Sequence, residues 1–161
     1  MCTLNRHLSR VQIGLPPREA TIIAQFPAVL SLHCLSVTPV VATIDEARFN
    51  ALCPEPAEVA DVFSMPLRHF LEDHPRHTAY QQRFGDHSYR IHHFAWQKFD
   101  VWGLTAGILI NVAEAAFARR AAFDVTGDDV DYGELYSHDG LSVCLKRRSA
   151  RLRGEAARLR S

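Results

Sequence analysis

The sequence predicts a mixed α/β or α+β fold, in which strand-rich segments are followed by a buried helix. Residues 20–44 and 89–96 are rich in β-branched and aromatic side chains, which favour a pleated surface. Residues 101–120 carry apolar side chains at helical spacing over a wide face. At 161 residues, the chain has the usual length of one domain. These elements are therefore expected to form one α/β sandwich.

Three strands are predicted in the first 65 residues. Residues 21–26 are the first, and residues 35–44 are the second. Pro39 lies inside the second and cannot donate a ladder hydrogen bond, so a bulge or a sheet edge is expected there. After a turn at residues 53–56, residues 58–65 are the third strand candidate.

The middle of the chain is predicted to hold a short helix, a loop and a strand. Pro66 suits the first turn of a helix over residues 67–71, because that position needs no N–H donor. Residues 72–88 are polar and rich in histidine, which predicts a loop. Residues 89–96 are predicted to form a strand with mixed faces.

A long helix is predicted over residues 101–120. Asp100 is the expected N-cap, since its carboxylate can accept hydrogen bonds from the first N–H groups. Arg119 and Arg120 fall in the expected last turn, where cations complement the helix dipole. The core-facing stripe is predicted at Leu104, Ile108, Val112 and Ala115, with Leu109, Ala113 and Ala116 beside it.

The chain is predicted to divide into an N-terminal segment (1–12), a folded part (13–123) and a tail (124–161). Six acidic side chains lie in residues 124–139 and seven basic ones in residues 146–161, so disorder is expected for the tail. One hypothesis is that the basic end contacts nucleic acid or acidic lipid. The other, which we favour, is a solvated end that pairs loosely with the acidic stretch.

Charge and cysteine content argue against several classes of protein. Eighteen basic and eighteen acidic side chains cancel, so no nucleic-acid or membrane partner is predicted. No apolar run reaches the roughly 18 residues of a membrane helix, and no secretory signal is recognised. The cytoplasm is the default location, and free thiols are expected at Cys2, Cys34, Cys53 and Cys144.

The nine histidines do not form a recognisable metal motif. His92 and His93 would point to opposite faces of a strand, so they could not chelate one ion together. His74, His77 and His87 fall in the predicted loop, without a Cys or Asp at ligand spacing. Surface or half-buried histidines are therefore the expectation.

Four segments occur in a distinctive order and spacing. They are Ile13-Gly14-Leu15, Val37-Thr38-Pro39-Val40-Val41, Glu58-Val59-Ala60-Asp61-Val62-Phe63-Ser64-Met65-Pro66-Leu67 and Trp102-Gly103-Leu104-Thr105-Ala106. Together they resemble the C-terminal two-thirds of a coenzyme A-type Nudix hydrolase, and most closely the plant members of that group. The resemblance covers roughly residues 13–123.

This resemblance implies a Nudix fold, in which a mixed sheet is sandwiched between helices. It also implies a pyrophosphatase that splits coenzyme A or its thioesters at the diphosphate, with Mg²⁺ or Mn²⁺. Divalent cations neutralise the phosphate charge and lower the pKa of bound water, and such hard cations take carboxylate ligands. Intact relatives could be mitochondrial or peroxisomal.

The catalytic motif of that family, G-x5-E-x7-R-E-U-x-E-E-x-G-U with U an aliphatic residue, is absent. When its last two positions are placed on Gly14 and Leu15, its Arg-Glu pair falls on His7 and Leu8, and its two adjacent glutamates fall on Val11 and Gln12. No Asp or Glu lies between Met1 and Gly14, so no catalytic or metal-binding residue is predicted. Glu58 matches a glutamate of the family pattern, for which a hydrogen-bonding role is favoured over metal binding.

Two hypotheses follow for activity. The first is a Nudix hydrolase by descent, impaired because the motif glutamates are missing. The second is an inactive truncated remnant, which binds a partner or associates with itself through an exposed sheet edge. In either case the expected small molecule is a coenzyme A-like compound.

Overall fold

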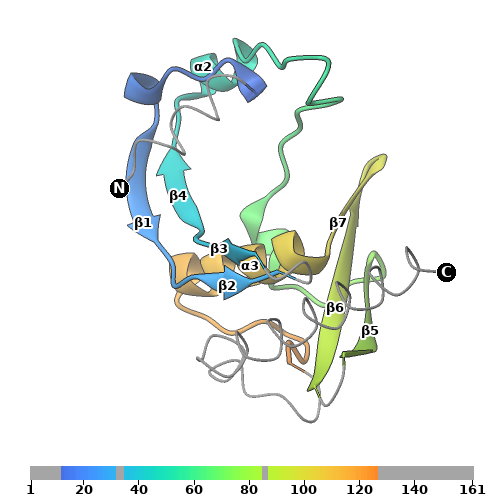
Figure 1. Cartoon of the computed structure of the whole chain (residues 1–161). Helices are drawn as coiled ribbons and strands as arrows, with labels where there is room; N and C mark the ends of the chain where they lie inside the picture. Colours follow the sequence, from blue (N-terminus) through green and yellow to red (C-terminus); the bar gives the residue numbers. More distant parts are fainter. Residues whose placement is uncertain (1–11, 32–34, 85–86, 127–161) are drawn as a thin grey trace, which may run out of the picture. The chain divides into compact units, whose positions relative to one another are not determined.

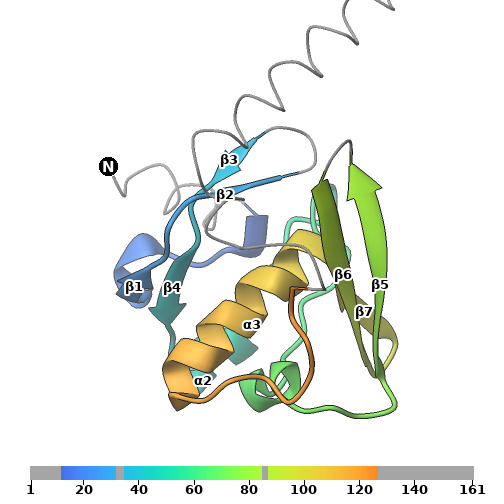
Figure 2. The ribbon, with the colours of Figure 1, turned by 90° about the horizontal axis from the view of Figure 1, so that it is seen from below.

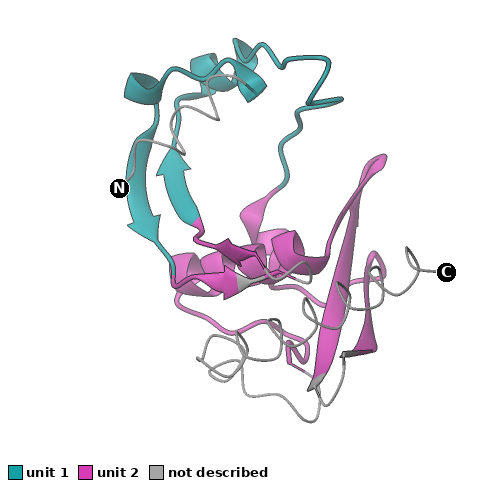
Figure 3. Cartoon of the chain, viewed as in Figure 1, with its two compact units in different colours: residues 1–26, 40–65 teal, residues 27–39, 66–161 magenta. Residues whose placement is uncertain are grey.

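The computed structural model describes residues 12–31, 35–84 and 87–126. The chain forms two compact units: residues 1–26 and 40–65 make the first, and residues 27–39 and 66–161 make the second (Figure 3). Both units combine antiparallel strands with short helices. The predicted α+β class is therefore confirmed, and it is consistent with a Nudix-type α/β fold.

The first unit is built on a strand pair. Its elements are η1 (Pro17–Glu19), β1 (Thr21–Gln25), β4 (Val40–Thr43) and α2 (Glu46–Asn50). Strands β1 and β4 are antiparallel, with Thr21 opposite Thr43, and a bulge interrupts their register between Ile22 and Ala24 (Figure 1). The strand predicted at residues 21–26 is confirmed, and the one predicted at residues 35–44 is divided at Pro39, which cannot donate to a ladder.

The segment around Gly14 is joined to a loop 40 residues later in the chain. The N–H of Cys53 donates to the carbonyl oxygen of Ile13 at 3.2 Å, and that of Glu55 donates to the carbonyl of Gln12 at 2.8 Å. Gly14 has a φ of +69°, and a Cβ placed there would lie 2.9 Å from the Cys53 carbonyl oxygen. Only glycine permits both this backbone conformation and this close approach.

The strand predicted at residues 58–65 is wrong, because the structure has turns and irregular backbone there. Val62 and Phe63 are the β-favouring residues that led to the prediction, and both are exposed. Strand propensity describes how well side chains fit a half-buried pleated surface, and this segment has no ladder partner among the described residues.

The second unit contains a three-stranded antiparallel sheet with one long helix against it. A small pair, β2 (Val29–Leu30) and β3 (Ser36–Val37), precedes η2 (Leu67–Phe70). The sheet consists of β5 (His77–Phe84), β6 (His87–Trp96) and β7 (Phe99–Trp102), with β6 in the centre. Helix α3 (Gly103–Phe117) packs against β6, β7 and η2, as Figure 2 shows.

Strand β5 corrects the loop predicted over residues 72–88. It pairs with β6 along its whole length, from His77 opposite Phe94 to Phe84 opposite His87. Its side chains are largely polar, and it lies at the edge of the sheet, where one face and one side can remain exposed. The partner strand, rather than the local composition, makes this segment extended.

The boundaries of α3 also differ from the prediction. Asp100 lies in β7 opposite Ala95, so it does not cap the helix, which begins at Gly103 after Trp102. Gly103 has a φ of +61°, a conformation that glycine adopts readily at an abrupt change from strand to helix. The helix ends at Phe117, and Ala118 is left-handed, so Arg119 and Arg120 lie beyond the last turn.

The core of the second unit lies between α3 and the sheet. The helix buries Ala106, Ile110, Val112 and Ala113, whereas Leu104 remains 39% exposed. Of the predicted stripe, Val112 is buried and Ile108 half-buried, whereas Leu104 and Ala115 are exposed. Of the residues predicted beside it, Ala113 is buried, Leu109 is half-buried and Ala116 is exposed. Because α3 is apolar around most of its circumference, spacing alone could not single out the side that packs. The other deeply buried side chains of this core are Phe70, Leu71 and Phe94.

The structure describes only part of the predicted division of the chain. Residues 1–11, 32–34 and 127–161 lie outside the described residues, and with them most of the predicted tail and the cysteines Cys2, Cys34 and Cys144. Of the tail residues that are described, Asp124 and Val125 contact Arg90 and His92 of β6. Cys53 is a free, exposed thiol.

Replacing Gly14 by alanine is expected to lower the free energy of unfolding by at least about 1 kcal/mol. A Cβ makes the left-handed backbone unfavourable, and here it would also collide with the Cys53 carbonyl oxygen. Urea denaturation measures the loss. Gly107 in α3 is the matched control, because nothing lies within 4 Å of a Cβ built there and alanine is the better helix former. Equal losses for both substitutions would contradict this account.

Candidate functional site

The end of the motif region lies beside the segment that leads to Glu58. Gln12 and Ile13 accept hydrogen bonds from the backbone N–H groups of Glu55 and Cys53, as described above, and Leu15 is buried. Gln12, which occupies a glutamate position of the family motif, is exposed and carries a neutral amide. The other three substituted motif positions, His7, Leu8 and Val11, lie outside the described residues.

Glu58 is exposed at a turn in this segment. Its backbone N–H donates to the carbonyl oxygen of Glu55 at 3.0 Å. No hydrogen bond or ion pair involves its carboxylate among the described residues, so its predicted polar contact stays a prediction. Nor does that part of the chain contain three or more His, Cys, Asp or Glu side chains placed to hold a metal ion. The described residues therefore offer no such group to Mg²⁺ or Mn²⁺.

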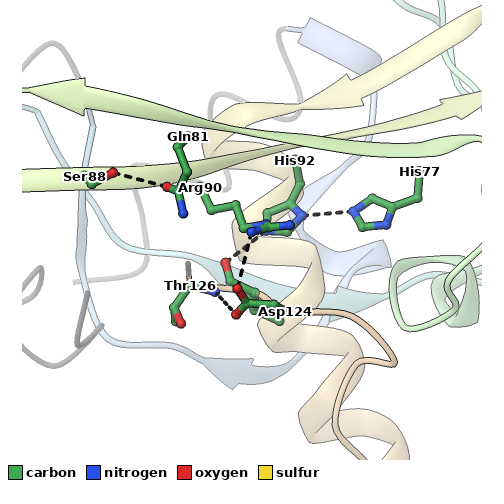
Figure 4. Close-up of polar contacts among 8 residues, drawn as sticks. His77, Gln81, Ser88, Arg90, His92, Asp124 and Thr126 are labelled. Carbon is green, nitrogen blue, oxygen red and sulfur yellow. Dashed lines mark hydrogen bonds and ion pairs between the residues drawn. The ribbon is translucent and has the colours of Figure 1, made fainter. Parts of the chain in front are cut away.

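A second cluster lies on the side of the sheet that faces α3. There His77 Nε2 lies 3.0 Å from His92 Nδ1, and His92 Nε2 lies 2.9 Å from the carbonyl oxygen of Val125 (Figure 4). Sequence reasoning missed this contact because it placed His77 in a loop. In the structure, β5 and β6 pair with Ala79 opposite His92, which brings the two imidazoles onto the same face.

The histidine pair is held neutral by its surroundings. His92 is 1% exposed, and burial is the main cause that lowers its pKa. Burial, followed by the proximity of His92, lowers the pKa of His77 to about 4. The His77 ring also stacks on Phe94 at a centroid distance of 4.5 Å, and it contacts the tilted ring of Phe123 at 4.0 Å. Neutral imidazoles suit this apolar environment, because transfer of a charge from water into it is costly.

An ion pair accompanies the histidines. Arg90 Nη1 lies 3.3 Å from Asp124 Oδ2, and the N–H of Thr126 donates to Asp124 Oδ1 at 3.2 Å (Figure 4). Both charged side chains are partly exposed, so the pair is expected to contribute less than about 1 kcal/mol. Together with the histidine chain, it attaches residues 124–126 to β6.

The opposite face of β6 carries a separate polar pair. His93 Nδ1 lies 2.7 Å from Asp100 Oδ2, and its ring stacks on Trp102 with 5.5 Å between centroids. Trp102 is 55% exposed, so this face of the sheet is open. The prediction that His92 and His93 point to opposite faces is confirmed.

The α+β fold is consistent with the class of the Nudix hydrolases. No family model matches the chain. Its curated relatives are nevertheless named Nudix hydrolases, and their similarity supports the Nudix family for the matched part of the chain.

Three relatives represent the plant and bacterial groups. Nudix hydrolase 15, mitochondrial, from Arabidopsis thaliana is 38% identical over 117 residues, which are 70% of this chain and 40% of that protein. Nudix hydrolase 22, chloroplastic, from the same plant is 34% identical over 129 residues, 77% of this chain and 42% of the relative. The uncharacterized Nudix hydrolase NudL of Enterobacter sp. (strain 638) is 37% identical over 103 residues, 63% and 52% respectively.

Three further findings concern the extent of the match, the names of the plant relatives and the helices. The match spans only 40–52% of the length of these three relatives. The two plant proteins are named for the mitochondrion and the chloroplast. In the part of the chain that the structure describes, every helix is too short or too polar to cross a bilayer.

Proposed function

We propose that this chain carries the part of a coenzyme A-type Nudix hydrolase that follows the catalytic motif. The observation that carries the proposal is the 38% identity over 117 residues to a plant Nudix hydrolase, together with the Trp102-Gly103-Leu104-Thr105-Ala106 segment. A nucleoside-diphosphate-linked compound is the substrate class that this relationship supports. Coenzyme A or its thioesters, cleaved at the diphosphate, are the proposed substrates.

With the residues present here, we propose that hydrolysis is impaired. Attack of water on a diphosphate needs its negative charge neutralised, which the family achieves with Mg²⁺ or Mn²⁺. Those cations require oxygen ligands, mainly carboxylates. Gln12, Val11 and Leu8 offer no carboxylate, and Glu58 alone would not assemble a site for several ions.

Incubation of the full chain with coenzyme A and Mn²⁺ is expected to give no 4′-phosphopantetheine and 3′,5′-ADP above a metal-free control. Chromatography of the products measures this. Turnover would show that carboxylates outside the motif bind the metal, and it would overturn the proposed impairment. In that event Glu58→Gln would test the one family-matched carboxylate.

A gain-of-function variant tests the same proposal by adding the missing carboxylates and measuring Mn²⁺ binding. Four substitutions restore the Arg-Glu pair and the two adjacent glutamates of the motif: His7→Arg, Leu8→Glu, Val11→Glu and Gln12→Glu. The variant is expected to bind Mn²⁺ more tightly than the wild type, as followed by electron paramagnetic resonance of the free ion. The matched control places Gln at positions 8, 11 and 12, and it should bind no more than the wild type. Equal Mn²⁺ binding by all three proteins would count against the motif alignment.

The second candidate function is association with a partner or with another copy of the chain. It is favoured by the position of β5, an eight-residue strand that has a ladder partner on one side only among the described residues. Unpaired strand edges can pair with other chains. Sedimentation velocity over a wide concentration range distinguishes this candidate, because self-association raises the sedimentation coefficient with concentration whether or not hydrolysis occurs.

A further inference from the structure

The segment Phe123–Thr126 is attached to β6 at three points. The buried His92 contacts the Val125 carbonyl oxygen at 2.9 Å, Arg90 pairs with Asp124 at 3.3 Å, and the Phe123 ring packs 5.4 Å from the ring of His92. Just before it, the N–H of Ala122 donates to the Leu71 carbonyl oxygen at 2.8 Å. Among these groups, His92 is the one whose ordinary pKa lies near neutral pH. Its bond to the Val125 carbonyl favours the protonated ring, so acid weakens the attachment only through the charges that His77 and His92 would place opposite each other.

The bonds of the two histidines define where their protons lie. A carbonyl oxygen only accepts, so His92 Nε2 carries the proton in the contact with Val125. In the neutral pair, His92 Nδ1 therefore accepts from His77 Nε2. A first added proton can be shared between these facing nitrogens, if His77 takes its other tautomer. A second proton would leave N–H opposite N–H at 3.0 Å, with two positive charges beside apolar rings.

The charged groups around the pair do not compensate for a second proton. Asp73, which precedes β5, and Asp124 favour protonation of the pair, whereas His74 and Arg90 oppose it. His93 lies on the same strand and also opposes protonation of His92. In α3 the one ionisable side chain is that of Glu114, which binds the Ala121 N–H and Arg120. In η2, His69 contacts His74, Phe94 and Trp96, and Arg68 lies over Phe117.

We propose that His77 and His92 form a pH-sensitive latch, which holds residues 123–126 on β6 while the pair is neutral or shares one proton and releases them when both rings are protonated. The latch requires no metal or substrate, so it does not depend on the proposed hydrolase function. Acid therefore changes how residues 123–126 are held on β6.

Nuclear magnetic resonance of the ¹⁵N-labelled full chain tests the latch. Long-range ¹H–¹⁵N spectra follow both rings, and amide signals follow residues 122–126 between pH 7.5 and 3. The amide signals of the segment are expected to change with the midpoint of the second histidine proton, while signals from α3 remain those of the folded protein. Segment amides that do not change across that midpoint would overturn the proposal.

Four variants separate the two histidines from other titrating groups. Asp124→Asn removes the carboxylate but keeps an oxygen for the Thr126 N–H, so the midpoint should persist; its loss would assign the effect to Asp124 and overturn the latch. His92→Gln should abolish the midpoint. If His92→Gln does not fold, His77→Gln replaces it and should also abolish the midpoint. His93→Gln, on the opposite face of β6, is the matched control and should leave the midpoint unchanged.

Discussion

Replacing Phe94 by alanine is expected to lower the free energy of unfolding by about 3–5 kcal/mol, the largest loss for a single substitution in the second unit. Phe94 is fully buried at the centre of the sheet. Its ring lies 4.9 Å from that of Phe70 and 4.5 Å from that of His77. Truncation removes these contacts and leaves a cavity that the paired strands cannot close. Because small domains have a net stability of about 5–15 kcal/mol, the variant is expected to be partly unfolded at 37 °C.

Urea denaturation followed by circular dichroism measures the effect of Phe94→Ala. Phe117→Ala is the matched control, since Phe117 is 41% exposed at the end of α3 and contacts the Arg68 guanidinium. That substitution should cost about 1 kcal/mol or less, because little apolar area leaves a buried environment. Similar losses at both positions would show that the core is not where the structure places it.

The free energy of unfolding is expected to fall by about 1–2 kcal/mol when the pH is lowered from 7 to 5. Burial lowers the pKa of His77 from 6.5 to about 4 and also lowers that of His92. In the unfolded chain both rings return to an ordinary pKa and bind protons more readily. Stability from a lowered histidine pKa is complete above pH 6.5 and is lost as the pH falls towards the folded-state value, so unfolding takes up protons throughout this window.

Urea titrations at several pH values between 7.5 and 5 test the sign of this dependence. This range lies above the ordinary pKa of carboxylates, which keeps the histidine contribution separate. His77→Gln should flatten the dependence, and His93→Gln should leave most of it in place. An increase in stability on acidification would contradict the neutral, buried pair. A flat curve for the wild type would mean that these rings are as accessible to protons in the folded chain as in the unfolded one.

Hydrolysis and the latch rest on different parts of the chain. The proposed impairment concerns residues 7–12 and can be tested with coenzyme A, whereas the latch concerns residues 77–126 and can be tested without any ligand. An active wild-type chain would therefore leave the latch standing. A segment insensitive to acid would likewise leave the Nudix relationship untouched.

The sequence by itself determined several features whose physical cause is local. Runs with β-branched or aromatic residues become strands β1, β4 and β6, because such side chains fit a pleated surface wherever a partner is available. The apolar run after Gly103 becomes α3, and the glycine permits the strand to turn into a helix. The lack of acidic residues before Gly14 is likewise a property of the sequence, and the expectation about metal ions depends on it alone.

Only the tertiary structure decided which segments meet. Strand β5 is extended because β6 pairs with it, although its own residues predicted a loop. The buried side of α3 is set by the sheet beneath it, since the helix offers apolar side chains on more than one face. The contact of His77 with His92, 15 residues away in the chain, follows from the register of two strands. Contacts of this kind depend on the free energy of the whole fold rather than on neighbouring residues, so local patterns could not reveal them.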